Sequence, residues 1–144
     1  MSAIQELDDN THQQIARRSA AGNEYMEQGN YVSAIDEFRA AFKLVPEPYQ
    51  DSDASLGLLA SLGEAYYFTG EYLHAHAALA KAMHVPGAIG TPHIHLRLGE
   101  VQFELGNTQR AADELLRAYM GGGEEIFEGE DEKYFAFLKR NAVL

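Results

Sequence analysis

The sequence contains no cysteine and no tryptophan, and only 11 of its 144 residues are lysine or arginine, against 22 aspartates and glutamates. Without cysteine the chain can form neither a disulfide framework nor a thiolate metal site, which fits a reducing compartment. The net charge of −11 argues against a nucleic-acid partner, because phosphate contacts need clustered lysine and arginine. An acidic balance keeps a surface hydrated and favours encounter with a cationic protein.

Long apolar runs are also missing. Nowhere do about 18 apolar residues follow one another, and residues 1–18 are polar, without the apolar segment of a secretion signal. We therefore expect a soluble, cytoplasmic protein with no membrane partner. A length of 144 residues is typical of one domain, so we expect residues 1–144 to form a single one.

What the sequence does contain is a pair of glycines seven residues apart that occurs three times. The pairs are Gly22 and Gly29, Gly63 and Gly70, and Gly99 and Gly106. The first glycine of each pair predicts a close approach of two helices, and the second predicts a helix end in the left-handed conformation. In the helix that follows each glycine pair, an alanine lies one turn before a large apolar residue, so the two residues share one face of that helix. These residues are Ala34 with Phe38, Ala75 with Leu79, and Ala111 with Leu115.

The middle copy shows the full phrase, L-x-x-L-G-x-x-Y and then A-x-x-x-L, in residues 59–79. It resembles the tetratricopeptide repeat (TPR) family, and the resemblance extends over residues 15–120. It implies an all-α fold, a right-handed superhelix of three helix-turn-helix repeats. We place these at about 15–46, 56–86 and 92–120.

The segment after the third repeat predicts a cover for the open end of the stack. We expect three glycines at 121–123 to stop the preceding helix at Met120. Six of the nine residues 124–132 are acidic, and an apolar stripe follows. Acidic residues favour a helix start, so we predict a capping helix at about 130–141. The alternative is that Ile126 and Phe127 form an exposed arm that binds a partner.

Two prolines in residues 46–53 prevent a continuous helix and predict a long connector. Within it, Tyr49 either covers the joint between the first two repeats, which we favour, or belongs to a binding edge.

The resemblance implies that the first helix of each repeat lines a concave, partner-binding surface. Placing these helices by their shared phase gives nine expected partner-binding residues: Asn23, Met26, Glu27, Glu64, Tyr67, Phe68, Glu100, Phe103 and Glu104. Arg97, on the first helix of the third repeat, is the tenth. Carboxylates alternate with aromatic rings in this set, which favours a cationic or amphipathic protein segment. We expect Glu64, Glu100 and Glu104 to face solvent. Alternatively, the rings pack against neighbouring helices and the glutamates are ordinary solvated residues.

Some TPR proteins hold a peptide carboxylate through lysine, asparagine and arginine on their first helices. Asn23, His93 and Arg97 stand at matching positions, but Ser19 occupies the place of the lysine. We expect no such clamp here.

The six histidines do not form a helical ligand pair. His74 and His76, like His93 and His95, are two residues apart and point to different sides of a helix. His95 takes the aromatic position of its repeat, so we expect it to be packed. No H-E-x-x-H, phosphate loop, G-x-S-x-G or cysteine nucleophile occurs. We therefore expect no enzyme activity, no cofactor and no metal.

Together these features favour a non-enzymatic protein-binding module. Residues 118–139 are similar to the endings of small stand-alone bacterial TPR proteins that accompany toxins. The most specific hypothesis is an immunity (antitoxin) protein that neutralises a basic toxin or effector domain. The alternatives are a secretion chaperone that holds an extended stretch of its effector, and a self-assembling adaptor that dimerises through the open edge of the stack.

Overall fold

The computed structural model describes residues 9–46 and 52–144, and the described part is built from helices alone. The seven α-helices are α1 (Asp9–Glu27), α2 (Tyr31–Leu44), α3 (Asp53–Phe68), α4 (Tyr72–Ala82), α5 (Pro92–Glu104), α6 (Thr108–Gly122) and α7 (Glu132–Asn141). Two short 3₁₀ helices, η3 (Ala88–Gly90) and η4 (Glu124–Phe127), precede α5 and α7. The predicted all-α fold is confirmed. Tyr49 lies outside the described residues.

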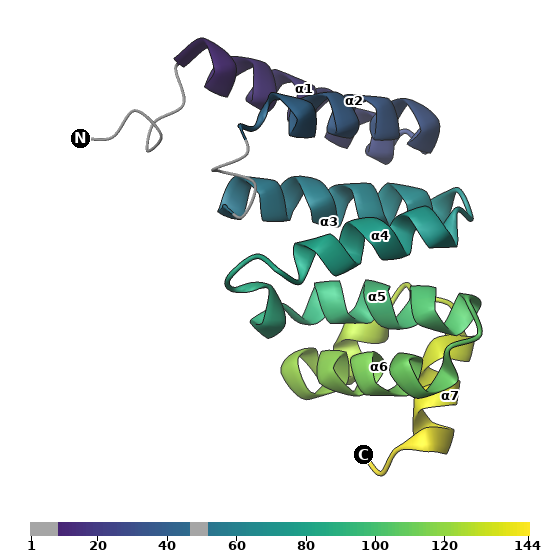
Figure 1. Ribbon diagram of the computed structural model, residues 1–144. Helices are drawn as coiled ribbons and strands as arrows, with labels where there is room; N and C mark the ends of the chain where they lie inside the picture. Colours follow the sequence, from purple (N-terminus) through teal and green to yellow (C-terminus); the bar gives the residue numbers. More distant parts are fainter. Residues whose placement is uncertain (1–8, 47–51) are drawn as a thin grey trace.

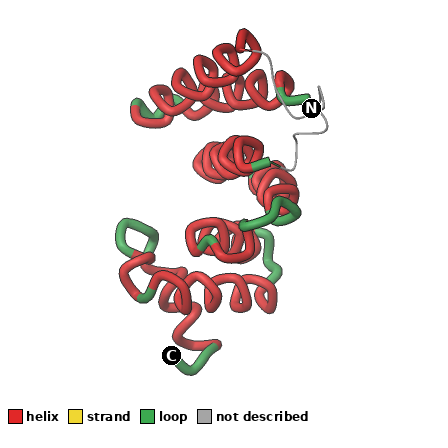
Figure 2. The backbone as a smooth tube through the Cα atoms, turned by 90° about the vertical axis from the view of Figure 1, so that its left-hand side faces the viewer, coloured by secondary structure: helices red, strands yellow, loops and turns green. Residues whose placement is uncertain are grey.

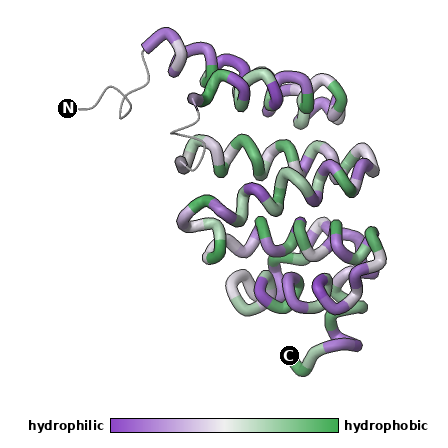
Figure 3. The backbone as a smooth tube through the Cα atoms, viewed as in Figure 1, coloured by the Kyte–Doolittle hydropathy of each residue, from purple (hydrophilic) through white to green (hydrophobic). Residues whose placement is uncertain are grey.

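The six helices α1 to α6 form three antiparallel hairpins, stacked one after another (Figure 1). Seen from the side, the hairpins lie in successive layers, and the chain ends beneath the third (Figure 2). Polar and apolar residues alternate along each helix, as expected when one face is buried (Figure 3). Apolar clusters join α1 and α2 to α3, α3 and α4 to α5, and α5 and α6 to the C-terminal segment.

The glycine pairs have the two predicted roles. A Cβ atom at Gly22, Gly63 or Gly99 would lie 2.5–2.7 Å from a side-chain atom of Phe38, Leu79 or Leu115, respectively. The two helices of each hairpin can therefore pack this closely only because the first helix has a glycine there. At the hairpin turns Gly29, Gly70 and Gly106 have φ angles of 74°, 78° and 85°. The residue after each of these glycines donates its backbone N–H to a carbonyl five residues earlier, at 2.8–2.9 Å. This bond satisfies a helix-end carbonyl identically in all three turns.

The prediction that the glycines at 121–123 end the sixth helix at Met120 is wrong by two residues. Helix α6 continues to Gly122 and ends at Gly123, whose φ is 71°. The two helical glycines serve close packing instead, because a Cβ at Gly121 would lie 2.7 Å from Pro92 Cγ and one at Gly122 would lie 2.9 Å from Ile126 Cδ1.

The C-terminal segment folds back onto the third hairpin. In η4, Ile126 and Phe127 are both only 8% exposed and belong to the apolar cluster of α5, α6 and α7. The alternative of an exposed arm built on these two residues is therefore wrong. Helix α7 supplies Tyr134, Phe137 and Leu138 to the same cluster, which covers the end of the stack.

Candidate functional site

A groove of about 490 Å³ crosses the first helices of all three hairpins. Five of the predicted partner-binding residues line it: Asn23, Met26, Glu27, Glu64 and Arg97. Phe38 and Leu79 reach the same groove from the second helices, opposite the bare backbones of Gly22 and Gly63. Because these two glycines have no side chains, Phe38 and Leu79 can supply apolar surface to the groove, between its polar side chains.

The groove is acidic at its open side. Asn23 and Glu27 on α1 are exposed, and the side chain of Glu64 on α3 is 41% exposed. Arg97 on α5, by contrast, has only 9% of its side chain exposed. The negative groups of the groove are thus more accessible than its arginine.

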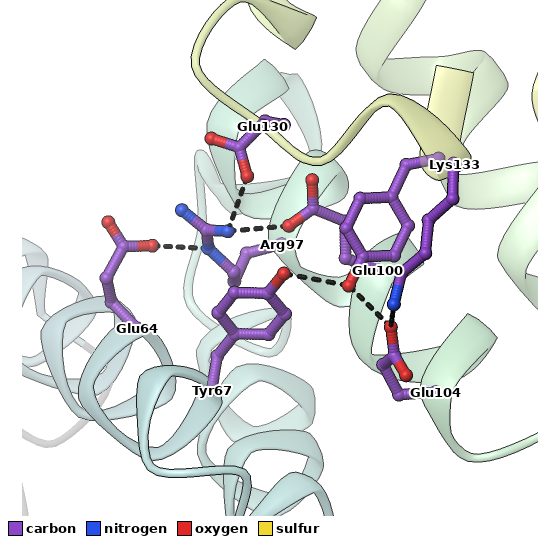
Figure 4. A network of polar contacts seen from close by, with 8 residues as sticks. Glu64, Tyr67, Arg97, Glu100, Glu104, Glu130 and Lys133 are labelled. Carbon is purple, nitrogen blue, oxygen red and sulfur yellow. Dashed lines mark hydrogen bonds and ion pairs between the residues drawn. The ribbon is translucent and has the colours of Figure 1, made fainter. Parts of the chain in front are cut away.

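Arg97 is held by three glutamates and lies beside the ring of Tyr67 (Figure 4). Its Nε donates to Glu64 Oε1 at 2.5 Å, and its Nη1 donates to Glu100 Oε1 at 2.5 Å and to Glu130 Oε1 at 2.8 Å. The guanidinium carbon lies 4.4 Å from the ring centroid of Tyr67 and 5.1 Å from that of Phe68. Burial alone lowers the pKa of Arg97, but the surrounding carboxylates, Glu64 foremost, raise it overall. The arginine is charged and already paired.

Glu100 does not face solvent, and that prediction is wrong. Its side chain is fully buried beside Arg97, and its Oε2 has no hydrogen-bond partner among the described residues. Burial raises the pKa of Glu100 to about 9; Arg97 opposes the rise and Glu130 adds to it. At pH 7 the group is therefore a neutral acid.

Three more predicted partner-binding residues contact the C-terminal segment instead of lining the groove. The hydroxyl of Tyr134 donates to Glu104 Oε2 at 2.6 Å, so the Tyr67 hydroxyl, 2.8 Å from it, donates to Tyr134. Phe103 packs edge-on against Tyr134, with ring centroids 5.4 Å apart. Lys133 Nζ completes the chain at 2.8 Å from Glu104 Oε2. Burial raises the pKa of Tyr67 to about 12 and also raises the pKa of Tyr134. Both hydroxyls therefore keep their protons at neutral pH.

These contacts correct the predicted exposure of Glu104, whose side chain is only 17% exposed. The physical reason is that the covering segment lies over the inner side of α5, where Glu100, Phe103 and Glu104 point. Phe68 does not line the groove either. It is 46% exposed, its ring stacks on that of Tyr31 at 5.0 Å, and it also lies beside the Arg97 guanidinium.

A tetratricopeptide repeat family matches residues 60–125, which run from the middle of α3 to the start of η4. This segment of the chain is similar to TPR repeats. Solved TPR domains share the fold of the chain: the second TPR domain of human RPAP3, bound to the HSP70 peptide SGPTIEEVD, is 18% identical with a TM-score of 0.67, and the match covers 90% of this chain and 96% of that one. No curated protein matches the sequence.

Two further solved structures have a similar fold to this chain. The first TPR of Spaghetti (RPAP3), bound to the HSP90 peptide SRMEEVD, is 20% identical with a TM-score of 0.66, and the match covers 89% of this chain and 90% of that one. The Sgt2 TPR domain from Aspergillus fumigatus is 19% identical with a TM-score of 0.65, covering 88% and 75%. At these identities the likeness concerns the fold.

Sequence reasoning missed the C-terminal contributors to this site, Glu130, Lys133 and Tyr134. Glu130 stands in an acidic run that reads as solvated surface, and nothing local marks it as the partner of Arg97, 33 residues earlier. The available signal was that a capping helix must cover part of α5.

The histidines show no metal-binding arrangement within residues 9–46 and 52–144, where no three His, Cys, Asp or Glu side chains gather as metal ligands. His95 is packed as predicted, 3% exposed, with Nδ1 2.5 Å from Glu114 Oε2 and Nε2 2.6 Å from the Ile89 carbonyl oxygen. Among the helices of the described part, none has the length and apolar character to span a membrane.

Proposed function

We propose that this protein binds a partner protein by taking a cationic segment into the groove across α1, α3 and α5. The observation that carries the proposal is the pairing of Arg97. The groove's arginine is bound by the chain's own carboxylates, while Glu27 and much of Glu64 remain accessible. A lysine or arginine of a partner gains Coulomb energy there, and a carboxylate meets repulsion.

The peptides in the similar TPR structures make the contrast clear. The sequences SGPTIEEVD and SRMEEVD both end in acidic residues. In this chain Ser19 stands where a clamp lysine would be needed, and the charged Arg97 is already paired with the chain's own glutamates. The proposed ligand therefore has the opposite charge to the peptides bound by these two neighbours.

The more specific form of the proposal is an immunity protein that neutralises a basic toxin or effector domain. Its support is the similarity of residues 118–139 to endings of that group, together with the net charge of −11. An immunity protein binds a folded domain and abolishes its activity, whereas a secretion chaperone binds an extended stretch. The peptide complexes of the neighbouring TPR domains favour the chaperone as the second candidate.

The groove is tested by calorimetry with the peptide Ac-RAARAARA-NH2 and its acidic counterpart Ac-EAAEAAEA-NH2. We expect only the basic peptide to bind, and the double variant Glu27→Gln, Glu64→Gln to weaken it by about fivefold to tenfold. The fold should persist, because a glutamine at 64 keeps an oxygen that accepts from Arg97 Nε.

The matched control is Asp36→Asn with Asp113→Asn, which removes two charges from exposed sites on α2 and α6. Equal weakening by both double variants would mean that only the net charge attracts the peptide. Binding of the acidic peptide at similar strength would refute the proposal outright.

A further inference from the structure

We infer that the C-terminal segment carries a second docking site, a groove between η4 and α7 that takes a lysine or arginine of a partner protein. The groove has a volume of about 380 Å³ and is separate from the one across the first helices. The inference rests on the proposed function only for the class of partner, a cationic protein segment.

An aromatic wall lines this groove. Phe127 of η4 and Phe135 of α7 both border it, and their rings stack with centroids 4.8 Å apart and planes at 30°. Phe135 also stacks on Tyr119 of α6, at 6.1 Å. Phe135 is thus held in place by two neighbouring rings, and an aromatic ring attracts an ammonium or guanidinium group.

The rim is acidic and largely unpaired. Within the described part of the chain, Glu124, Glu128 and Glu132 are exposed and have neither an ion pair nor a side-chain hydrogen bond. The other two rim acids are engaged: Glu130 binds Arg97, and Asp131 accepts from the Lys133 backbone N–H. Three carboxylates around aromatic rings complement a cation that is both charged and partly apolar.

One cation of the chain already occupies the aromatic face. Lys139 Nζ lies 4.9 Å from the Phe135 centroid, and Lys139 lines the same groove. It has no ion-pair partner among the described residues, and its side chain lies on the exposed surface of α7. Lys139 therefore shows which chemical group the site accepts, and an incoming lysine or arginine must compete with it.

The two grooves adjoin through one ion pair. Arg97 lines the first groove, Glu130 lines the second, and Arg97 Nη1 and Glu130 Oε1 are 2.8 Å apart. A partner with two spaced cationic side chains can therefore engage both grooves, and engagement of both raises the overall affinity by effective concentration.

The test is a nitrogen-15 amide titration of the full chain with Ac-RAARAARA-NH2. We expect shifts in residues 124–139 as well as in α1 and α3. Glu124→Gln with Glu128→Gln should weaken the apparent affinity reported by residues 124–139 by about threefold or more. The affinity reported by α1 and α3 should fall by a smaller factor, because those helices are affected only through peptide that engages both grooves. Asp36→Asn with Asp113→Asn should change neither.

Lysine variants supply a test of opposite sign. Lys139→Gln should strengthen binding at residues 124–139 by about twofold or more, because it removes the competing cation. Lys81→Gln is the matched control, since Lys81 Nζ also lies 4.9 Å from a ring centroid, that of Phe42, outside this groove.

Shifts confined to α1 and α3, or equal effects of the Lys139 and Lys81 variants, would overturn the second site and leave the proposed function standing. Shifts confined to residues 124–139 would overturn the proposed function and leave the second site standing.

Discussion

Gly63→Val is expected to lower the free energy of unfolding by about 3 kcal/mol, the upper end of the cost of overpacking a core. A Cβ at Gly63 would lie 2.5 Å from both Cγ and Cδ2 of Leu79. Leu79 is only 1% exposed, so its side chain cannot move into solvent. Valine adds two further methyl groups to this contact, and α3 and α4 must separate.

The control for this prediction lies on the same helix. Gly57 has nothing within 4 Å of its Cβ position, so Gly57→Ala should raise the free energy of unfolding by about 0.5–1 kcal/mol through helix propensity. Urea denaturation followed by circular dichroism measures both. A Gly63→Val variant as stable as the parent would show that the hairpin does not close at this glycine.

The hairpins could be predicted from the sequence because their contacts are local. The first glycine of each pair packs against a large residue sixteen positions later. Gly22 packs against Phe38, and Gly63 packs against Leu79. The second glycine of each pair, at the turn, follows the first by seven positions. Short separations of this kind recur in phase, so three copies reinforce one another and fix which faces of α1 to α6 are buried.

The inner side of the third hairpin could not be predicted in the same way. The phase of the repeat correctly sends Glu100 and Glu104 to the inner side, but it does not say what covers that side. The cover is non-local: Glu130 reaches Arg97, and Tyr134 reaches Glu104 across 30 residues. A predicted capping helix and predicted solvent-facing glutamates on α5 were in conflict, because a cap must bury part of the last repeat.

The burial of Glu100 decides which glutamates can be changed to test the groove. Reversing the charge of Glu64, Glu100 and Glu104 together would place a lysine at a fully buried position beside Arg97. Unpaired buried charge is strongly destabilising, so loss of binding by such a variant would report unfolding. Glu27 and Glu64 are the carboxylates whose removal tests the groove alone.

Glu100→Gln is expected to stabilise the protein by about 2–3 kcal/mol at pH 7. The pKa of Glu100 is raised from 4.5 to about 9 in the folded protein, so between these pH values the folded state holds a proton that the unfolded state has lost. Stability therefore falls as the pH rises through this window, and the loss is absent below the unfolded pKa. Glutamine keeps an oxygen for Arg97 Nη1 and cannot ionise in either state.

The gain should consequently grow from near zero at pH 4.5 to its maximum near pH 9, measured by urea denaturation at each pH. Glu104→Gln makes the same substitution one turn later on α5, where the carboxylate accepts from Tyr134 and Lys133. That variant should lose about 1 kcal/mol and keep the pH slope of the parent. If Glu100→Gln instead loses stability at every pH, Glu100 is an ionised partner of Arg97 in the folded protein.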